Sequence, residues 1–247
     1  MNDKNSIIMG PESSINQPLE CIILAGGLGT RLRSAVPDMP KCMAPVAGHP
    51  FLKHVIDYLL SEGVTKFIFS LGYMHEAIES FLETSYPNLQ YQIALESEPL
   101  GTGGAIHLAC KKATERNVLI LNGDTMFKAN LNSMMNFHLQ HQAACTLALK
   151  PMNDFDRYGV VDINHENYIQ SFKEKQHYEN GLINGGIYVL HVDTFLSLPF
   201  PEKFSFEKDY LEKYFNSQKM MGIVQDRYFI DIGIPEDFER ASNELKK

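Results

Sequence analysis

The fold is decided by Leu24-Ala25-Gly26-Gly27-Leu28-Gly29-Thr30-Arg31-Leu32, which directly follows the apolar run Cys21-Ile22-Ile23. A short β-branched run that ends in glycines is typical of a buried strand leading into a loop. Three glycines let the backbone approach a ligand closely and turn its amides toward phosphate oxygens. Arg31 and the nearby Lys41 supply positive charge. The stretch therefore predicts a phosphate-binding loop at a strand end, of the kind that would fit a triphosphate.

Two common glycine-rich motifs do not match this loop. A Walker loop needs Lys and then Ser or Thr after its last glycine, whereas Gly29 is followed by Thr30 and Arg31. The dinucleotide motif G-x-G-x-x-G would need a glycine at Leu32. Kinase and dehydrogenase functions are therefore disfavoured.

Outward from the loop, apolar runs alternate with segments of helical period. Strands are predicted at 21–25, 66–70, 90–95 and 118–121, with helical segments around 51–59, 78–82 and 106–109. The second half predicts strands at 145–149, 159–163, 168–172 and 186–190, a helix over 206–215, short strands at 221–224 and 228–230, and a last helix from Pro235. This order indicates an α/β fold that is Rossmann-like, with a mixed, mostly parallel central sheet flanked by helices. We expect one domain over 20–247, preceded by a flexible extension at 1–19.

Composition excludes several classes of function. The 247 residues include 44% hydrophobic ones, which suits a globular protein, and the net charge of −8 argues against nucleic acid as a partner. No apolar run approaches the roughly 20 residues of a membrane span, and the N-terminus lacks the apolar region of a signal peptide. The four cysteines form no C-x-x-C pair and are expected to be reduced thiols. A cytoplasmic protein that does not bind membranes is expected.

Further motifs follow the glycine loop in a fixed order. They are Pro40-Lys41-Cys42-Met43-Ala44-Pro45, Glu98-Pro99-Leu100-Gly101-Thr102-Gly103-Gly104-Ala105, Asn122-Gly123-Asp124, Phe172-Lys173-Glu174-Lys175, Asn184-Gly185-Gly186-Ile187-Tyr188 and Asp231-Ile232-Gly233-Ile234-Pro235-Glu236-Asp237-Phe238. With these motifs the chain resembles the sugar-1-phosphate nucleotidyltransferases over essentially residues 20–240. The resemblance implies the nucleotide-diphospho-sugar transferase fold, with a nucleotide-binding first half and a sugar-phosphate-binding second half.

The resemblance also implies an in-line attack by a sugar phosphate on the α-phosphorus of a nucleoside triphosphate, with release of pyrophosphate. Asp124 and Asp231 would hold Mg²⁺, which prefers oxygen ligands. Arg31 would hold the leaving pyrophosphate, Lys41 the nucleotide phosphates through the transition state, and Lys175 the phosphate of the sugar.

The remaining predicted site residues form two groups. Predicted nucleotide-binding residues are Leu24, Ala25, Gly26, Gly27, Gly29, Thr30, Glu96, Pro99, Gly101, Thr102 and Gly123. Predicted sugar-phosphate-binding residues are Gly159, Glu174, Lys175, Asn184 and Gly185.

Glu96 predicts the base. A carboxylate only accepts hydrogen bonds, and guanine offers two adjacent donors on its Watson-Crick edge, so GTP is favoured. The compact chain resembles the D-glycero-α-D-manno-heptose 1-phosphate guanylyltransferases within the family. Alternatives are a mannose-1-phosphate guanylyltransferase, a thymidylyl- or cytidylyltransferase, a uridylyltransferase acting on N-acetylmuramate 1-phosphate, and a non-catalytic sugar-nucleotide-binding regulatory subunit. Small molecules are the expected partners, and the protein is expected to be a monomer or homodimer.

Overall fold

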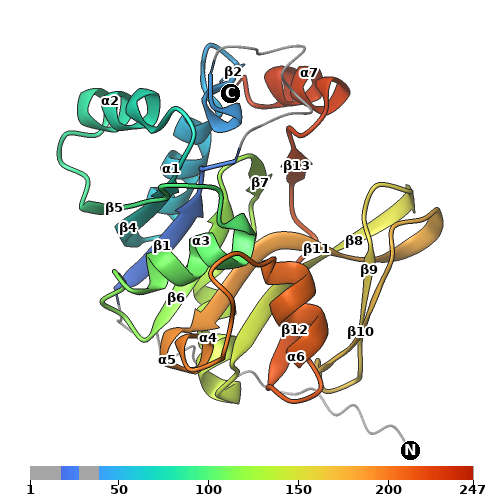
Figure 1. The fold of residues 1–247 in the computed structure, drawn as a ribbon. Coiled ribbons are helices and arrows are strands. Elements are labelled where there is room, and N and C mark those ends of the chain that lie inside the picture. Colours follow the sequence, from blue (N-terminus) through green and yellow to red (C-terminus); the bar gives the residue numbers. More distant parts are fainter. Residues whose placement is uncertain (1–17, 28–38, 247) are drawn as a thin grey trace, which may run out of the picture.

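The structure is a computed structural model that describes residues 18–27 and 39–246 (Figure 1). The predicted extension at 1–19 therefore lies outside the described residues, except for its last two positions. Gly29, Thr30 and Arg31 of the glycine loop also lie outside them. Within the described part, the central sheet has nine strands, seven of them in the order β10-β9-β11-β6-β1-β4-β5, with β8 and β12 joined through β11.

A parallel core forms the first half of the sheet. The strands are β1 (Leu19–Leu24), β4 (Val64–Leu71), β5 (Tyr91–Leu95) and β6 (Asn117–Asn122). β1 lies between β4 and β6, and β5 pairs with the outer side of β4, all in parallel. All four strands were predicted from sequence. Parallel strands end at the same edge of the sheet, so the segments that follow β1 and β6 meet there.

The second half adds an antiparallel extension. It comprises β8 (Cys145–Phe155), β9 (Val160–Ile163), β10 (Ile169–Lys173), β11 (Tyr178–His191) and β12 (Met220–Val224). β11 pairs antiparallel with both β6 and β8, while β12 pairs parallel with β8. β8 and β11 are longer than predicted because they keep pairing beyond the core, as far as Phe155 and Tyr178. This arm carries β9 and β10 to one side of the molecule (Figure 1).

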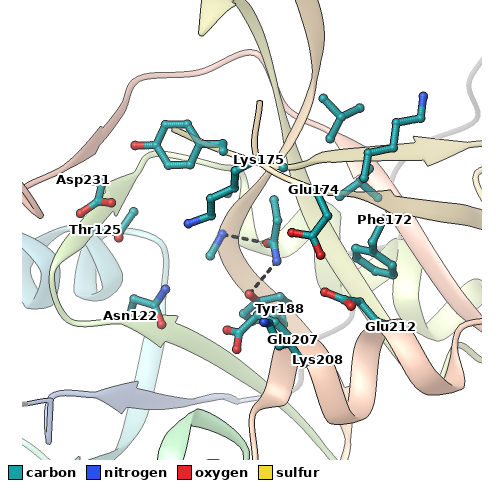
Figure 2. A pocket seen from close by; sticks show the side chains of 18 of the residues that line it. Asn122, Thr125, Phe172, Glu174, Lys175, Tyr188, Glu207, Lys208, Glu212 and Asp231 are labelled. Carbon is teal, nitrogen blue, oxygen red and sulfur yellow. Dashed lines mark hydrogen bonds between the residues drawn. The ribbon is translucent and has the colours of Figure 1, made fainter. Parts of the chain in front are cut away.

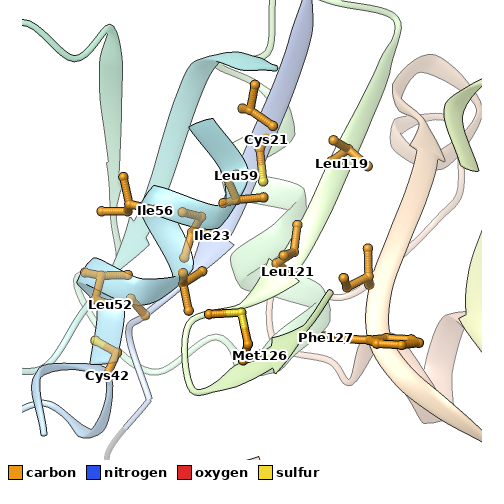
Figure 3. Close-up of a cluster of buried hydrophobic side chains, with 14 of the residues drawn as sticks. Cys21, Ile23, Cys42, Leu52, Ile56, Leu59, Leu119, Leu121, Met126 and Phe127 are labelled. Carbon is orange, nitrogen blue, oxygen red and sulfur yellow. The ribbon is translucent and has the colours of Figure 1, made fainter. Parts of the chain in front are cut away.

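Helices cover both faces of the sheet. One face is packed by α1 (Phe51–Ser61), α2 (His75–Ser85), α4 (Leu131–His141) and α7 (Pro235–Glu244). The other is packed by α3 (Gly101–Cys110), α5 (Val192–Leu196) and the π-helix η2 (Phe206–Leu211), which continues into α6 (Glu212–Tyr214). Alternate strand residues serve the two faces: Cys21 and Ile23 face the first, and Ile22 the second (Figure 3). The predicted α/β fold, with a mixed central sheet flanked by helices, is therefore confirmed.

Several helical segments differ from the sequence prediction, which included neither α5 nor the short 3-10 helix at Lys41–Met43. The helix α4 was not predicted, although Leu131, Met134, Met135 and His138 repeat at helical spacing and the Asn130 side chain caps the helix by accepting from Ser133 N. The helix predicted over 206–215 forms, but its first part is a π-helix. The last helix begins at Pro235, as predicted.

Short strands complete the edge of the sheet where β1 and β6 end. They are β2 (Pro45–Val46), β3 (His49–Pro50), β7 (Thr125–Phe127) and β13 (Phe229–Asp231), and the 3-10 helix η1 (Lys41–Met43) precedes them. β13 pairs antiparallel with β7, so that Asp231 lies opposite Thr125. Residues more than a hundred positions apart are thereby brought to one place.

All four cysteines are free and buried, which confirms the expectation of reduced thiols. Burial raises the pKa of the Cys42 thiol to about 12, so this thiol remains protonated at neutral pH. Within 18–27 and 39–246, no helix is both long and apolar enough to span a membrane.

His138 is a buried histidine whose ring bonds Thr146 Oγ1 (2.9 Å) and Asn117 Oδ1 (3.0 Å). Burial lowers its pKa to about 4, so the native state keeps the ring neutral while the unfolded chain takes up a proton below pH 6.5. Stability should therefore fall as the pH drops from 6.5 toward 4.

His138→Gln tests this pH dependence. The unfolding free energy of each protein is measured by urea titration at pH 7.5 and at pH 5, and we predict that it drops by ~2 kcal/mol more in the wild type than in His138→Gln. Equal losses in the two proteins would contradict this.

Candidate active site

Three segments that are distant in the sequence converge on the ammonium group of Lys41. Lys41 begins η1, and its Nζ lies 2.5 Å from Asp124 Oδ2 and 3.6 Å from Asp231 Oδ1. Pairing of β7 with β13 sets the two carboxylates side by side, and Ile232 N donates to the carbonyl of Asp124 at 3.1 Å. The structure therefore brings together three of the five residues predicted to be catalytic.

The two aspartates form a negatively charged pair around one cation. Burial raises the pKa of the Asp231 carboxyl and the Asp124 charge adds to the rise, while Lys41 and the N–H of Gly233, which donates to Asp231 Oδ1 at 2.7 Å, oppose it. Two carboxylates sharing one ammonium carry excess negative charge, which favours a further cation beside them.

The donor set was tested for its fit to Mg²⁺. Magnesium is commonly bound by one or two carboxylates, with phosphate oxygens and water completing its six ligands. Asp124 and Asp231 supply two such carboxylates, and in the part of the chain that the structure describes no cluster of three or more His, Cys, Asp or Glu forms a cage of protein ligands. The pair thus fits a magnesium ion shared with a phosphorylated ligand better than a resident structural metal.

The glycine loop begins next to Glu96. Ala25 N donates to Ser70 O at 2.9 Å and Gly123 N donates to Leu24 O at 2.8 Å, which fixes the end of β1 between its neighbours. A Cβ on Gly26 would lie 2.7 Å from Glu96 Oε1 and 3.0 Å from the amide nitrogen of Gly72. Only glycine therefore allows the backbone to pass so close to the Glu96 carboxylate.

Glu96 is half-buried and held in place. Its Oε2 accepts a hydrogen bond from Leu100 N at 2.9 Å, whereas Oε1 lies against Gly26. Burial raises the pKa of the Glu96 carboxyl, and the Leu100 N–H opposes the rise. The loop predicted to bind the nucleotide thus lies beside the carboxylate that was predicted to recognise the base.

The start of α3 has contacts that the sequence did not reveal. Gly101 has a φ of +73°, and Thr102 Oγ1 accepts from Phe206 N (2.9 Å) and donates to Glu207 Oε2 (2.7 Å). The N–H groups of Gly103 and Gly104 donate to Phe204 O. This helix start therefore holds the segment that leads into η2. The nucleotide-binding roles of Pro99, Gly101 and Thr102 stay predictions.

A pocket of about 500 Å³ opens beside the charged pair (Figure 2). Every residue predicted to bind the sugar phosphate lines it, together with Asp231: Gly159, Glu174, Lys175, Asn184 and Gly185. None of the predicted nucleotide-binding residues that the structure describes lines this pocket, so these residues and the predicted sugar-side residues occupy different places. The Lys175 side chain extends toward the side of the pocket where Asp231 and Thr125 lie (Figure 2). No ion pair to another described residue engages its ammonium group.

Several lining residues were not predicted as site residues. They are Asn122, Thr125, Tyr158, Phe172, Tyr188, Glu207, Lys208, Glu212 and Phe229, among others. Asn122, Phe172 and Tyr188 belong to motifs already quoted, so their position in those motifs was a usable signal. Glu207, Lys208 and Glu212 belong to a segment predicted only as a helix. Nothing in their local sequence pointed to a site.

The chain is similar to known proteins over most of its length. A D-glycero-alpha-D-manno-heptose 1-phosphate guanylyltransferase of Aneurinibacillus thermoaerophilus is 48% identical over 92% of this chain and 99% of its own length. One of Campylobacter jejuni is 42% identical over 89% of this chain and 97% of its own. This chain is also similar to the crystal structure of HddC from Yersinia pseudotuberculosis, which was solved in complex with GMP-PN as well. The TM-score is 0.84 and the sequence identity 38%, and the match covers 92% of this chain and 100% of the HddC chain.

The family model described as nucleotidyl transferase matches residues 20–247. This match spans both the glycine loop and the pocket. Together with relatives of 48% and 42% identity over nearly their whole length, it shows that the chain belongs to the nucleotidyl transferase family.

Proposed function

We propose that this protein transfers GMP from GTP to D-glycero-α-D-manno-heptose 1-phosphate, giving GDP-heptose and pyrophosphate. The observation that carries the proposal is the position of the Lys41, Asp124 and Asp231 cluster between a glycine loop and a pocket that contains Lys175. Such a cluster can serve two phosphorylated molecules at once. The guanylyltransferase names of the two relatives and the GMP-PN complex of HddC support this choice of substrates.

The reaction depends mainly on positioning and on charge. An oxygen of the sugar phosphate attacks the α-phosphorus, the bond to the bridging oxygen of pyrophosphate breaks, and negative charge gathers on the phosphate oxygens. The Lys41 ammonium would stabilise this negative charge, because two carboxylates already hold it in a fixed orientation. Lys175 would hold the attacking phosphate on the pocket side. Arg31, proposed to hold the pyrophosphate, lies outside the described residues.

Asp124 and Asp231 would bind Mg²⁺, which when bound neutralises phosphate oxygens. Lys41 lies between these carboxylates and would contact the nucleotide phosphates beside the metal site. Thr125 Oγ1, 3.3 Å from Asp124 Oδ1, and Gly233 N, 2.7 Å from Asp231 Oδ1, keep both carboxylates in position. The buried, free thiols favour a reducing compartment, and we place the reaction in the cytoplasm.

Glu96 is the residue we propose for choosing guanine. Guanine presents N1–H and an exocyclic amine side by side, whereas uracil presents one N–H between two carbonyl oxygens. Glu96 Oε2 already accepts from Leu100, which fixes the orientation of the carboxylate and leaves Oε1 and the remaining lone pairs as acceptors only. Such a group would attract the guanine edge and repel a carbonyl oxygen.

The proposed reaction is tested by a substrate panel. The four ribonucleoside triphosphates are each combined with heptose, mannose, glucose and N-acetylmuramate 1-phosphates in the presence of Mg²⁺, and pyrophosphate release is measured. We predict that GTP with the heptose 1-phosphate exceeds every other pair by at least tenfold in kcat/KM, about the discrimination that one or two specific hydrogen bonds provide. Equal turnover of GTP and UTP, or no release with any pair, would contradict the proposal.

Glu96→Gln tests the choice of base. Leu100 N–H should hold the amide oxygen of the new side chain, which turns its NH₂ group toward the base. This NH₂ donor would face the N–H donors of guanine, with which it cannot form hydrogen bonds, whereas it can donate to a uracil carbonyl. The kcat/KM for GTP divided by that for UTP should therefore fall at least about tenfold. The matched control is Glu98→Gln, at an exposed carboxylate of the same turn, which should leave the ratio unchanged. An unaltered ratio in Glu96→Gln would remove Glu96 from base recognition.

A further inference from the structure

Glu207, on the η2 wall of the pocket, is held by one oxygen only. Its Oε2 accepts from Thr102 Oγ1 at 2.7 Å and from Ser205 Oγ at 3.0 Å. Each of these hydroxyls in turn accepts a backbone N–H, from Phe206 at 2.9 Å and from Lys208 at 3.2 Å. Because each hydroxyl is fixed by the amide that it accepts, both hydroxyl protons are directed at the same carboxylate oxygen.

The other oxygen of Glu207 is left for a ligand. Across residues 18–27 and 39–246, no side chain or backbone group donates a hydrogen bond to Oε1. The carboxylate is half-buried and lines the pocket beside Tyr188 (Figure 2). An anchored carboxylate that lines a cavity and keeps one oxygen without a donor is suited to accept a hydrogen bond from a ligand in that cavity.

Tyr188 supplies the complementary donor. Its ring is buried, and its hydroxyl accepts from Asn184 Nδ2 at 2.9 Å, while its own proton meets no acceptor in the described part of the chain. Burial raises the pKa of Tyr188 well above its ordinary value, and the charge of the neighbouring Glu207 adds to this rise. The hydroxyl therefore keeps its proton, and a fixed donor and a fixed acceptor lie next to each other in the pocket.

We propose that Tyr188 Oη and Glu207 Oε1 together bind one hydroxyl of the sugar, and that Glu207 thereby determines which sugars are accepted. A sugar hydroxyl is both donor and acceptor, so it can accept from Tyr188 and donate to Glu207 at the same time. Glu207 and Tyr188 lie away from Asp231 in the pocket (Figure 2). The hydroxyl in question is therefore one remote from the anomeric phosphate. This assignment rests on the proposed function.

The η2 segment explains how a helix supplies this group. Its π-helical turn, a rare element that often occurs at functional sites, carries Glu207 and Lys208, and Glu212 at the start of α6 lines the same pocket. Thr102, at the start of α3, secures the segment from the side that carries the predicted nucleotide-binding residues. The acceptor for the sugar is thus held by the part of the fold that we propose serves the nucleotide.

Glu207→Gln tests the subsite. The fixed hydroxyls of Thr102 and Ser205 should hold the amide oxygen, so that the NH₂ group replaces the acceptor that faced the sugar. With heptose 1-phosphate as substrate, we expect its KM to rise about tenfold or more, while the KM for GTP stays within about twofold. Tyr188→Phe should raise the same KM, and the double variant should be no worse than about the larger single effect, because both residues bind one hydroxyl. An analogue that lacks this hydroxyl should have equal KM values in the wild type and Glu207→Gln.

The control is Glu202→Gln. Glu202 is an exposed residue of the preceding loop that does not line the pocket, so this substitution should leave the KM for GTP and the KM for the sugar phosphate unchanged. An unchanged sugar KM in Glu207→Gln, or equal rises in the KM for GTP and for the sugar, would overturn the subsite. If thermal melting shows that Glu207→Gln is unfolded, Tyr188→Phe is measured instead, and an unchanged KM for the sugar phosphate in that variant would overturn the subsite. A wild type that releases no pyrophosphate with any sugar phosphate would refute the proposed function, whereas an active wild type with an unaffected Glu207→Gln would refute the subsite alone.

Discussion

The site depends on one ammonium group shared by two carboxylates. Lys41 lies 2.5 Å from Asp124 and 3.6 Å from Asp231, and without its positive charge two half-buried carboxylates would face each other unpaired. The pairing of β7 with β13 brings the aspartates together, and Met126, Phe127 and Ile230 bury that small sheet in the core. Packing therefore holds two like charges close together, and it is positive charge, from Lys41 and from a bound metal ion, that would offset their repulsion.

The two halves of the fold contribute different parts of the site. The parallel core ends in the glycine loop and in Glu96, and the antiparallel arm of β8 and β11 carries the walls of the pocket. The Thr102 hydroxyl, which donates to Glu207 and accepts from Phe206 N, connects the two halves. Because one wall of the pocket is held from the other half, helical elements fix its position relative to the start of α3.

Much of this could be predicted from the sequence. The strands of the core followed from strand periodicity. The family resemblance implied that Lys41, Asp124 and Asp231 belong to one site, and it named five residues on the sugar side that line one pocket. The extent of β8 and β11, the η2 contacts and the role of Glu207 could not, because they depend on pairings between segments far apart in the chain. Helix α4 was missed for another reason: its apolar residues alternate with Asn, Ser and His, which weakens the helical pattern without abolishing it.

The central claim is that Asp124, paired with Lys41 and Asp231, is part of the catalytic machinery. The most direct measurement is pyrophosphate release at saturating GTP, sugar phosphate and Mg²⁺ by Asp124→Asn, compared with Asp226→Asn, which removes the carboxylate of a 2.5 Å ion pair to Lys150 outside the site. We predict a fall of about 100-fold or more for Asp124→Asn, because the proposed metal site would lose a charged ligand and Lys41 would lose its nearest partner, and little change for Asp226→Asn. Equal, undiminished rates in the two variants would contradict it.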